Sequence, residues 1–234
     1  MSSASSTDSS QLNLQPNNDS ANAVAKKLDA DETAGQVIAP WRSPLARAIH
    51  RNRAQPFSRY FQLATVRPDG TPANRTVVFR GFWADSNQLM MIGDRRSEKI
   101  EQIAENPAAE ACWYFAKTRE QFRLCGQLTV VTADTAHTGL VDAHQRLWQQ
   151  ISDSARAQFC WPYPKAPRAD DQDFSPPSPD EQMPPPQFCL LLLAVDSVDH
   201  LELRGEPQNR HLYTKTASSA QGNSQQWQVT AVNP

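Results

Sequence analysis

The amino-acid sequence predicts a mainly β protein with helical decoration, built as an antiparallel β-barrel that is closed or nearly closed. About eight segments have the composition and alternation of strands, only two or three have helical periodicity, and most neighbouring strands are separated by short turns. Hydrophobic residues make up 39% of the 234 residues and 18 residues are proline, so part of the chain is expected to lie outside the core.

The first 36 residues form a segment of unusual composition. Residues 1–36 are rich in Ser, Asn, Asp and Gln and contain almost no aromatic side chains. Such a segment cannot bury enough apolar surface to offset its conformational entropy, so we expect it to be disordered. It lacks the apolar stretch of a secretory signal, and the longest apolar run, Phe188 to Val195, is too short to cross a bilayer. The packed domain is therefore expected over residues 37–234.

The packed part begins with a predicted helix and three predicted strands. Apolar side chains recur at helical spacing over residues 41–50, where Pro44 would occupy the first turn. Strands are predicted over residues 60–66 and 72–84, which an Arg-Pro-Asp-Gly turn separates, and over residues 88–92 after a second turn. Because these strands need only short connections, they favour an antiparallel meander.

Two helices and two strands are predicted in the middle of the chain. The helix over residues 97–106 has readable ends, because Ser97 can cap it and an Asn-Pro pair stops it. Strands are predicted over residues 109–115 and 121–132. Apolar side chains then recur at helical spacing over residues 135–151.

The last third of the chain contains a proline-rich segment followed by strands. Residues 162–187 hold nine prolines and five acidic residues, which indicates a solvated, irregular loop. Strand-like sequence resumes directly after it. We expect residues 188–197 and 198–204 to pair with each other, and residues 211–216 and 227–232 to form a last hairpin.

The cysteines and the net charge narrow the class of protein. The four cysteines lie far apart and form no zinc-binding or redox motif, so each is interpreted as a free thiol in a reducing cytoplasm: Cys112, Cys125, Cys160 and Cys189. No metal site is predicted. The formal net charge of -2 gives no general argument for nucleic-acid binding.

The strand around residues 75–80 is the first candidate binding element. Alternate side chains share a face of a strand, so Arg75 and Arg80 point to opposite faces at the two ends of an apolar stretch. This arrangement suits a flat ligand with an anionic end, because the guanidinium fork matches a phosphate. The alternative is a pair of exposed arginines at a sheet edge.

Two further elements could contact the same ligand. Ser97 and Lys99 open the helix that follows, where free backbone N–H groups favour an anion. The alternative there is an ordinary capped surface helix. Gln121 begins a strand and could present its amide to a heteroaromatic edge, or it could simply face solvent beside a turn.

The order of these motifs resembles a known family. Arg-Thr-Val-Val-Phe-Arg at 75–80 is followed by Arg-Ser-Glu-Lys-Ile at 96–100, Cys-Trp-Tyr-Phe at 112–115 and Arg-Glu-Gln-Phe-Arg-Leu-Cys-Gly at 119–126. The set is similar to the pyridoxamine 5'-phosphate oxidase family, and most similar to its branch of FMN-dependent enzymes with a C-terminal Pro-Gln-x-Arg signature. The resemblance spans Ala39 to Pro234.

The resemblance implies a fold, a cofactor and a set of contacts. The fold is an FMN-binding split β-barrel that forms a homodimer with FMN at the subunit interface. The implied cofactor-binding residues are Arg75, Thr76, Val77, Val78, Phe79, Arg80, Ile92, Gly93, Ser97, Lys99, Gln121 and Arg210. The implied substrate-binding residues are Arg80, Arg156 and His211, and the resemblance assigns no catalytic acid or base.

Several positions depart from the family pattern. Glu98 replaces a second basic phosphate ligand, Leu203 replaces an aromatic residue beside the flavin, and the Arg-Leu-His substrate motif is not intact. The function implied is an FMN-dependent oxidoreductase that moves a hydride from an amine or alcohol, such as a vitamin B6 phosphate, to flavin. The alternatives are a non-catalytic flavin carrier and a related enzyme that uses a deazaflavin or haem. A nucleic-acid-binding barrel is disfavoured by the net charge.

Overall fold

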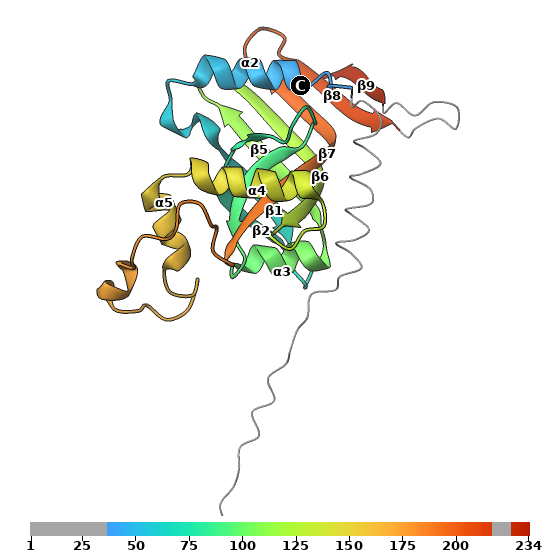
Figure 1. Cartoon of the computed structure of the whole chain (residues 1–234). Coiled ribbons are helices and arrows are strands. Elements are labelled where there is room, and N and C mark those ends of the chain that lie inside the picture. Colours follow the sequence, from blue (N-terminus) through green and yellow to red (C-terminus); the bar gives the residue numbers. More distant parts are fainter. Residues whose placement is uncertain (1–36, 217–225) are drawn as a thin grey trace, which may run out of the picture.

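The computed structural model describes residues 37–216 and 226–234 (Figure 1). The segment 1–36, which was predicted to be disordered, lies outside the described residues. Nine strands form one antiparallel sheet: β1 (Tyr60–Val66), β2 (Pro72–Val78), β3 (Gly81–Phe82), β4 (Leu89–Asp94), β5 (Ala108–Phe115), β6 (Glu120–Val131), β7 (Phe188–Glu202), β8 (Asn209–Thr216) and β9 (Gln226–Val232). Four α-helices are described: α2 (Arg42–Asn52), α3 (Glu98–Glu105), α4 (Thr138–Gln150) and α5 (Asp153–Ala157).

The sheet curls back on itself. Its strands follow the order β2-β1-β5-β6-β7-β4-β3, and β8 and β9 extend it beside β7. The two ends of this path, β2 and β3, are consecutive in the chain and separated only by Phe79 and Arg80. The Arg80 N–H donates to Met90 O at 2.9 Å, so the chain crosses directly from one end of the path to the other. The predicted split barrel is confirmed.

The barrel has a hydrophobic core on each side of β7. Leu191 and Leu193 pack inside the barrel with Trp113, whereas Leu190 and Leu192 face the second core under α4. The alternation of a strand explains this division, and burial on both faces explains why the sequence reads as a continuous apolar run. Figure 1 shows α2 and α3 at opposite ends of the barrel and α4 across the sheet.

One prediction about strand pairing is wrong, and a second is confirmed only in part. Residues 188–197 and 198–204 do not pair with each other, because β7 continues through both of them. A β-bulge at Asp196 lets the strand bend where the register with β6 shifts, so no turn is needed. The predicted strand 72–84 is divided into β2 and β3, so the predicted meander continues to β4 only through the two residues of β3, and the long neighbour of β4 is β7.

The helices follow the prediction more closely. The helix α2 has Pro44 in its first turn, as expected, and α3 and α4 lie within one to three residues of the predicted bounds. The short helix α5 was not predicted. None of the helices in the described ranges is long and apolar enough to span a bilayer.

Candidate functional site

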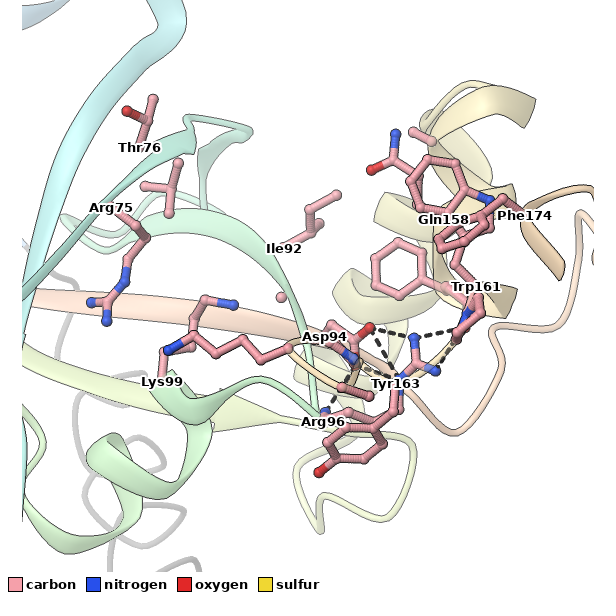
Figure 2. A pocket seen from close by; sticks show the side chains of 18 of the residues that line it. Arg75, Thr76, Ile92, Asp94, Arg96, Lys99, Gln158, Trp161, Tyr163 and Phe174 are labelled. Atoms are coloured by element: carbon pink, nitrogen blue, oxygen red, sulfur yellow. Dashed lines mark hydrogen bonds and ion pairs between the residues drawn. The ribbon is translucent and has the colours of Figure 1, made fainter. Parts of the chain in front are cut away.

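A cleft of about 760 Å³ lies between the barrel and the proline-rich segment. One side is formed by β2, β4 and the start of α3, and the other by residues 155–174. Figure 2 shows Arg75 and Lys99 on the first side, Trp161 and Phe174 on the other, and Ile92 between them. The volume is in the range typical of small-molecule and cofactor sites.

The cationic corner of the cleft is built by Arg75, Ser97 and Lys99. The Arg75 guanidinium donates to Thr65 Oγ1 at 2.5 Å and to Gln102 Oε1 at 3.0 Å, which fixes its position. Lys99 Nζ donates to Ser97 Oγ at 2.6 Å. The sequence therefore placed these three side chains correctly in one region.

The predicted cap of α3 is wrong in its detail. Ser97 occupies the N-cap position, but its side chain makes no capping hydrogen bond to the helix. Instead Ser97 Oγ donates to Asp94 O at 2.5 Å and accepts from Lys99. Because the hydroxyl does not cap, the first backbone N–H groups of α3 keep their capacity to bind an anion.

Three cations of the cleft have no ion-pair partner among the described residues: Arg75, Arg80 and Lys99. Burial lowers the pKa of each, and the charge of Arg67 lowers that of Arg75 further, as Arg59 does for Arg80. The Arg80 Nε is buried, and no described residue accepts a hydrogen bond from it. Partly desolvated cations without counter-charges favour an anionic ligand.

The floor of the cleft is apolar. Ile92 and Val78 contribute side chains, and Gly93 contributes backbone. A Cβ atom at Gly93 would point into the core, 3.2 Å from Cys189 Sγ and 3.3 Å from Leu191 Cδ1, so the core packing favours glycine here. Phe79 faces the same core and does not line the cleft, although the resemblance placed it among the cofactor contacts.

The opposite wall, residues 155–174, includes the first half of the proline-rich segment 162–187, which was predicted to be a solvated loop. Arg96 fixes it to β4, because its Nη1 donates to Trp161 O at 2.8 Å and its Nη2 donates to Phe159 O at 3.2 Å. Lys165 forms an ion pair with Glu98 at the start of α3. The aromatic residues between the prolines were the available signal for this wall, but their target could not be read from the sequence.

Comparisons with known proteins agree with this geometry. Residues 38–132 match the family model for the FMN-binding domain of pyridoxamine 5'-phosphate oxidase. Over 201 residues the chain is 36% identical to pyridoxine/pyridoxamine 5'-phosphate oxidase 2 of Arabidopsis thaliana, which covers 86% of the chain and 100% of the relative. The chain belongs to the pyridoxamine 5'-phosphate oxidase family.

Solved structures of similar proteins support the fold. A pyridoxamine 5'-phosphate oxidase-related, FMN-binding protein from Nostoc punctiforme is 54% identical, with a TM-score of 0.79, covering 85% of this chain and all of the other. PhzG from Burkholderia lata, solved with tetrahydrophenazine-1-carboxylic acid, has a TM-score of 0.67 at 16% identity, covering 87% and 96% of the two chains. This second likeness concerns the fold alone. FMN is the cofactor of the family's domain, and the cationic corner and apolar floor of the cleft fit such a molecule.

Ser97 contacts Lys99 but does not itself line the cleft, and besides Phe79 four more residues that the family resemblance assigned to the site lie outside it. Gln121 is on β6 opposite Tyr114, and His211 is on β8 opposite His200. Arg210, also on β8, forms a two-bond ion pair with Asp199, with N···O distances of 2.9 and 2.6 Å.

Arg156 is the fourth of these residues, and its surroundings are structural. Its side chain is buried and donates to Ile151 O at 2.9 Å and to Trp148 O at 3.3 Å, where α4 ends. It also pairs with Asp153. These carbonyls would lose their partners if Arg156 turned towards the cleft, so the chain does not present it to a substrate there.

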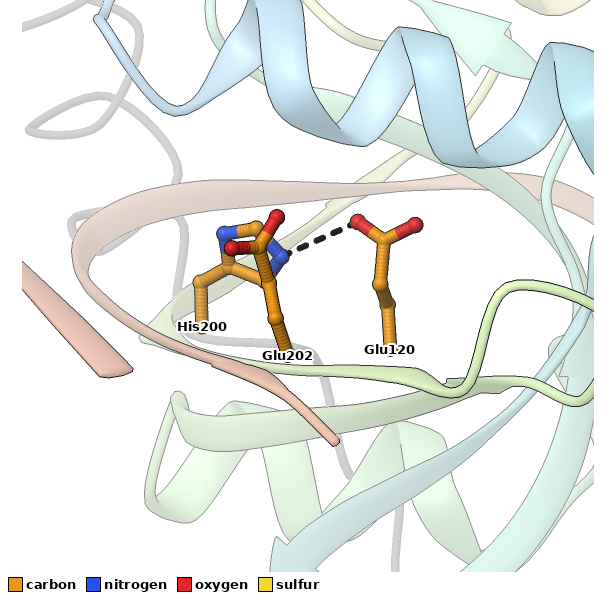
Figure 3. A group of neighbouring side chains, drawn as sticks. All are labelled: Glu120, His200 and Glu202. Carbon is orange, nitrogen blue, oxygen red and sulfur yellow. Dashed lines mark hydrogen bonds and ion pairs between the residues drawn. The ribbon is translucent and has the colours of Figure 1, made fainter. Parts of the chain in front are cut away.

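A second group of polar side chains lies elsewhere in the barrel (Figure 3). In the described part of the chain, Glu120, His200 and Glu202 have potential metal-ligand atoms within 4.8 Å of one another. His200 Nε2 and Glu120 Oε2 are 3.1 Å apart, and the imidazole stacks on Phe122. Burial raises the pKa of Glu120, but hydrogen bonds from His200 and Thr118 outweigh it and leave the pKa below its usual value. These contacts account for the buried pair without a metal.

Proposed function

We propose that this protein is an FMN-dependent oxidase that removes a hydride from the amine or alcohol carbon of a vitamin B6 phosphate. The observation that carries the proposal is the row of unpaired cations, Arg75, Lys99 and Arg80, along one side of the cleft. The names of the relatives, pyridoxine/pyridoxamine 5'-phosphate oxidases, supply the substrate class.

In this proposal each part of the cofactor contacts a different region of the cleft. Arg75 and Lys99 hold the phosphate at the cationic corner, beside Ser97, which positions Lys99, and the free backbone N–H groups at the start of α3. Arg80 lies two residues beyond the end of β2 and also lines the cleft, and it holds an anionic edge of the flavin or of the substrate ring. Val78 and Ile92 offer the ring an apolar surface between these two points.

The residues of the cleft orient the cofactor and the substrate and provide positive charge, but they offer little acid–base chemistry. When bound, FMN accepts the hydride and passes its electrons to oxygen or another acceptor. Among the residues that line the cleft the one carboxylate is Asp94, and it is held by Arg96 at 2.6 Å. In this proposal Arg80 contacts the anionic edge of the flavin or of the substrate ring, and the proton that the substrate loses is released to solvent.

We also propose that the protein is a cytoplasmic homodimer with FMN at the subunit interface. Gln121, Arg210 and His211 lie on strands away from the cleft, so they could contact cofactor or substrate only from a second copy. Each chain has a mass of 26.1 kDa, so a homodimer would have a mass of about 52 kDa by light scattering. A monomeric protein that nevertheless holds FMN would contradict this arrangement.

The test of the function is purification followed by turnover. The protein is expected to be yellow, to release FMN on denaturation, and to form one hydrogen peroxide for each pyridoxine or pyridoxamine 5'-phosphate oxidised in air. A colourless protein that takes up no added FMN would overturn the cofactor assignment. FMN uptake without reduction of the flavin by either substrate would overturn the oxidase assignment.

One alternative function has structural support. The buried position of Arg156 and the absence of His211 from the cleft remove two expected substrate contacts from the chain. These features favour a flavin carrier that binds FMN without turning over a substrate. One bound FMN per chain whose absorbance does not bleach when substrate is added without oxygen would support the carrier function.

A further inference from the structure

On the proline-rich wall of the cleft, the guanidinium of Arg168 is held in place by an aromatic ring. Arg168 lines the cleft, and its guanidinium carbon lies 4.3 Å from the centre of the Phe174 ring. The indole of Trp161 packs against the same ring edge-on, with centroids 5.6 Å apart. A guanidinium stacked on an aromatic ring keeps its plane and its donors in a defined orientation.

The wall is anchored to the turn that carries the cationic corner. Arg96 and Glu98 flank Ser97 in the sequence, and both hold the proline-rich segment, Arg96 through Trp161 O and Glu98 through Lys165. Figure 2 places Trp161 and Phe174 across the cleft from Arg75 and Lys99. The wall that carries Arg168 therefore faces the cationic corner and is held to it by these two contacts.

Arg168 is more available to a ligand than Lys165 on the same wall, or than Arg96, which anchors the wall from the turn after β4. Arg96 uses all its guanidinium nitrogens on Asp94 and two carbonyls, and Lys165 is paired with Glu98. Arg168 engages Nη2 with Asp171 at 2.5 Å, and both side chains are largely exposed, 71% and 92%. An ion pair this exposed is worth little in water, so a phosphate can replace the carboxylate.

We propose that Arg168 is the substrate-binding residue that recognises the anionic group of the substrate, and that Asp171 competes with that group for the guanidinium. This inference rests on the proposed function, because it assumes that FMN occupies the corner at Arg75 and Lys99. The ligand class is a planar ring that carries a phosphate. The proline-rich segment is then a specificity element of the site.

The experiment measures ligand affinity and cofactor affinity separately. The probe is 4-deoxypyridoxine 5'-phosphate, which has no group to oxidise at the 4' position and no aldehyde to react with lysine. It is titrated into the FMN-loaded protein and followed by the flavin absorbance, and FMN affinity is measured on the same variants. The second probe is 4-deoxypyridoxine, which lacks the phosphate.

The two partners of the ion pair should have opposite effects. Arg168→Ala should lower the affinity for the phosphate probe roughly tenfold, because a hydrogen bond to a charged group is lost. Asp171→Asn should raise this affinity several-fold, because the competing carboxylate is removed. Neither should change the affinity for FMN or for the probe without phosphate. If the pair were merely structural, both substitutions would loosen the wall and shift the affinity in the same direction.

The chain offers a matched control on α4. Arg146 and Asp142 form an exposed ion pair with a distance of 3.7 Å, and neither residue lines the cleft. Arg146→Ala and Asp142→Asn should leave both probes and FMN unaffected. Equal phosphate-probe affinity in Arg168→Ala and Arg146→Ala, with FMN bound normally, would overturn this inference and leave the proposed function standing. A wild-type protein that takes up no FMN would overturn both.

Discussion

Arg96 and Asp94 form an ion pair in which Arg96 Nη2 lies 2.6 Å and Nε 3.0 Å from the two carboxylate oxygens of Asp94. The same guanidinium donates through Nη1 to Trp161 O. The last residue of β4 is thereby joined to the far wall of the cleft through one side chain. The hydrogen bonds to Asp94 raise the pKa of Arg96, so its guanidinium keeps its charge.

The first prediction concerns this connection. Arg96→Met should release the proline-rich wall while the barrel keeps its core, because the side chain contacts Asp94 and two carbonyls rather than the core. We expect faster amide hydrogen exchange in residues 159–174 and unchanged exchange in β6 and β7. Arg95→Met, next to it in the chain, is the control, since Arg95 makes a single exposed side-chain hydrogen bond, to Pro186 O at 3.3 Å. Equal exchange rates of residues 159–174 in the wild type and in Arg96→Met would show that the wall is held by other contacts.

The second prediction concerns the phosphate corner. Lys99→Met should weaken FMN binding by about 1.5–3 kcal/mol, the usual contribution of a hydrogen bond to a charged group. The measurement is the dissociation constant of FMN from its fluorescence. Lys117→Met is a control on an exposed lysine away from the cleft. Equal affinities in the two variants would place the phosphate elsewhere.

The pH dependence of FMN affinity tests the same lysine independently. Burial lowers the pKa of Lys99, and the charge of Arg75 lowers it further, so free Lys99 loses its proton below the usual pH for a lysine. The FMN phosphate is already a dianion above about pH 7, so its own ionisation adds no change in affinity in the alkaline range. Wild-type affinity should therefore fall as the pH rises through this lowered pKa, whereas Lys99→Met should show no such fall. A parallel alkaline decline in both proteins would contradict the assignment.

That Arg75, Ser97 and Lys99 share one region, the cationic corner, could be predicted from sequence because its parts are local. Alternation placed Arg75 on a strand face, and the start of a readable helix placed Ser97 and Lys99 beside a free helix end. The apolar alternation of β1 and the double-sided burial of β7 are also local patterns. Each of these predictions needs only the few residues around it.

The far wall and the course of β7 could not be predicted, because both depend on contacts between residues far apart in the sequence. Trp161 and Phe174 are placed by Arg96, which lies more than 60 residues away in the sequence, and no local pattern marks that contact. The bulge at Asp196 carries neither glycine nor proline, so the sequence suggested a break between two strands. Gln121, Arg210 and His211 would need a second chain to reach the cleft, which one sequence does not show.

The third prediction separates structure from substrate binding at Arg156. Arg156→Ala should reduce the free energy of unfolding by about 3 kcal/mol, because it leaves the carbonyls of Trp148 and Ile151 buried without donors. Urea unfolding measures the loss. The affinity of the FMN-loaded protein for 4-deoxypyridoxine 5'-phosphate should stay unchanged. If the variant bound the probe more weakly and its free energy of unfolding were unchanged, Arg156 would be a substrate contact after all.

The last prediction concerns Gly126, beside the bulge where β6 and β7 change register. A Cβ atom there would lie 1.9 Å from Ala194 O, a backbone atom that cannot move without breaking the ladder. Gly126→Ala should therefore cost at least about 3 kcal/mol of the free energy of unfolding, at the upper end of overpacking costs. Gly70→Ala is the matched control: its φ of +81° disfavours alanine, but nothing lies within 4 Å, so only the backbone strain of about 1–2 kcal/mol applies. Urea unfolding of both variants separates steric overlap from backbone strain. Equal losses in the two would mean that β6 and β7 can separate at the bulge, and the close approach of the two strands at this point would then not be a requirement of the fold.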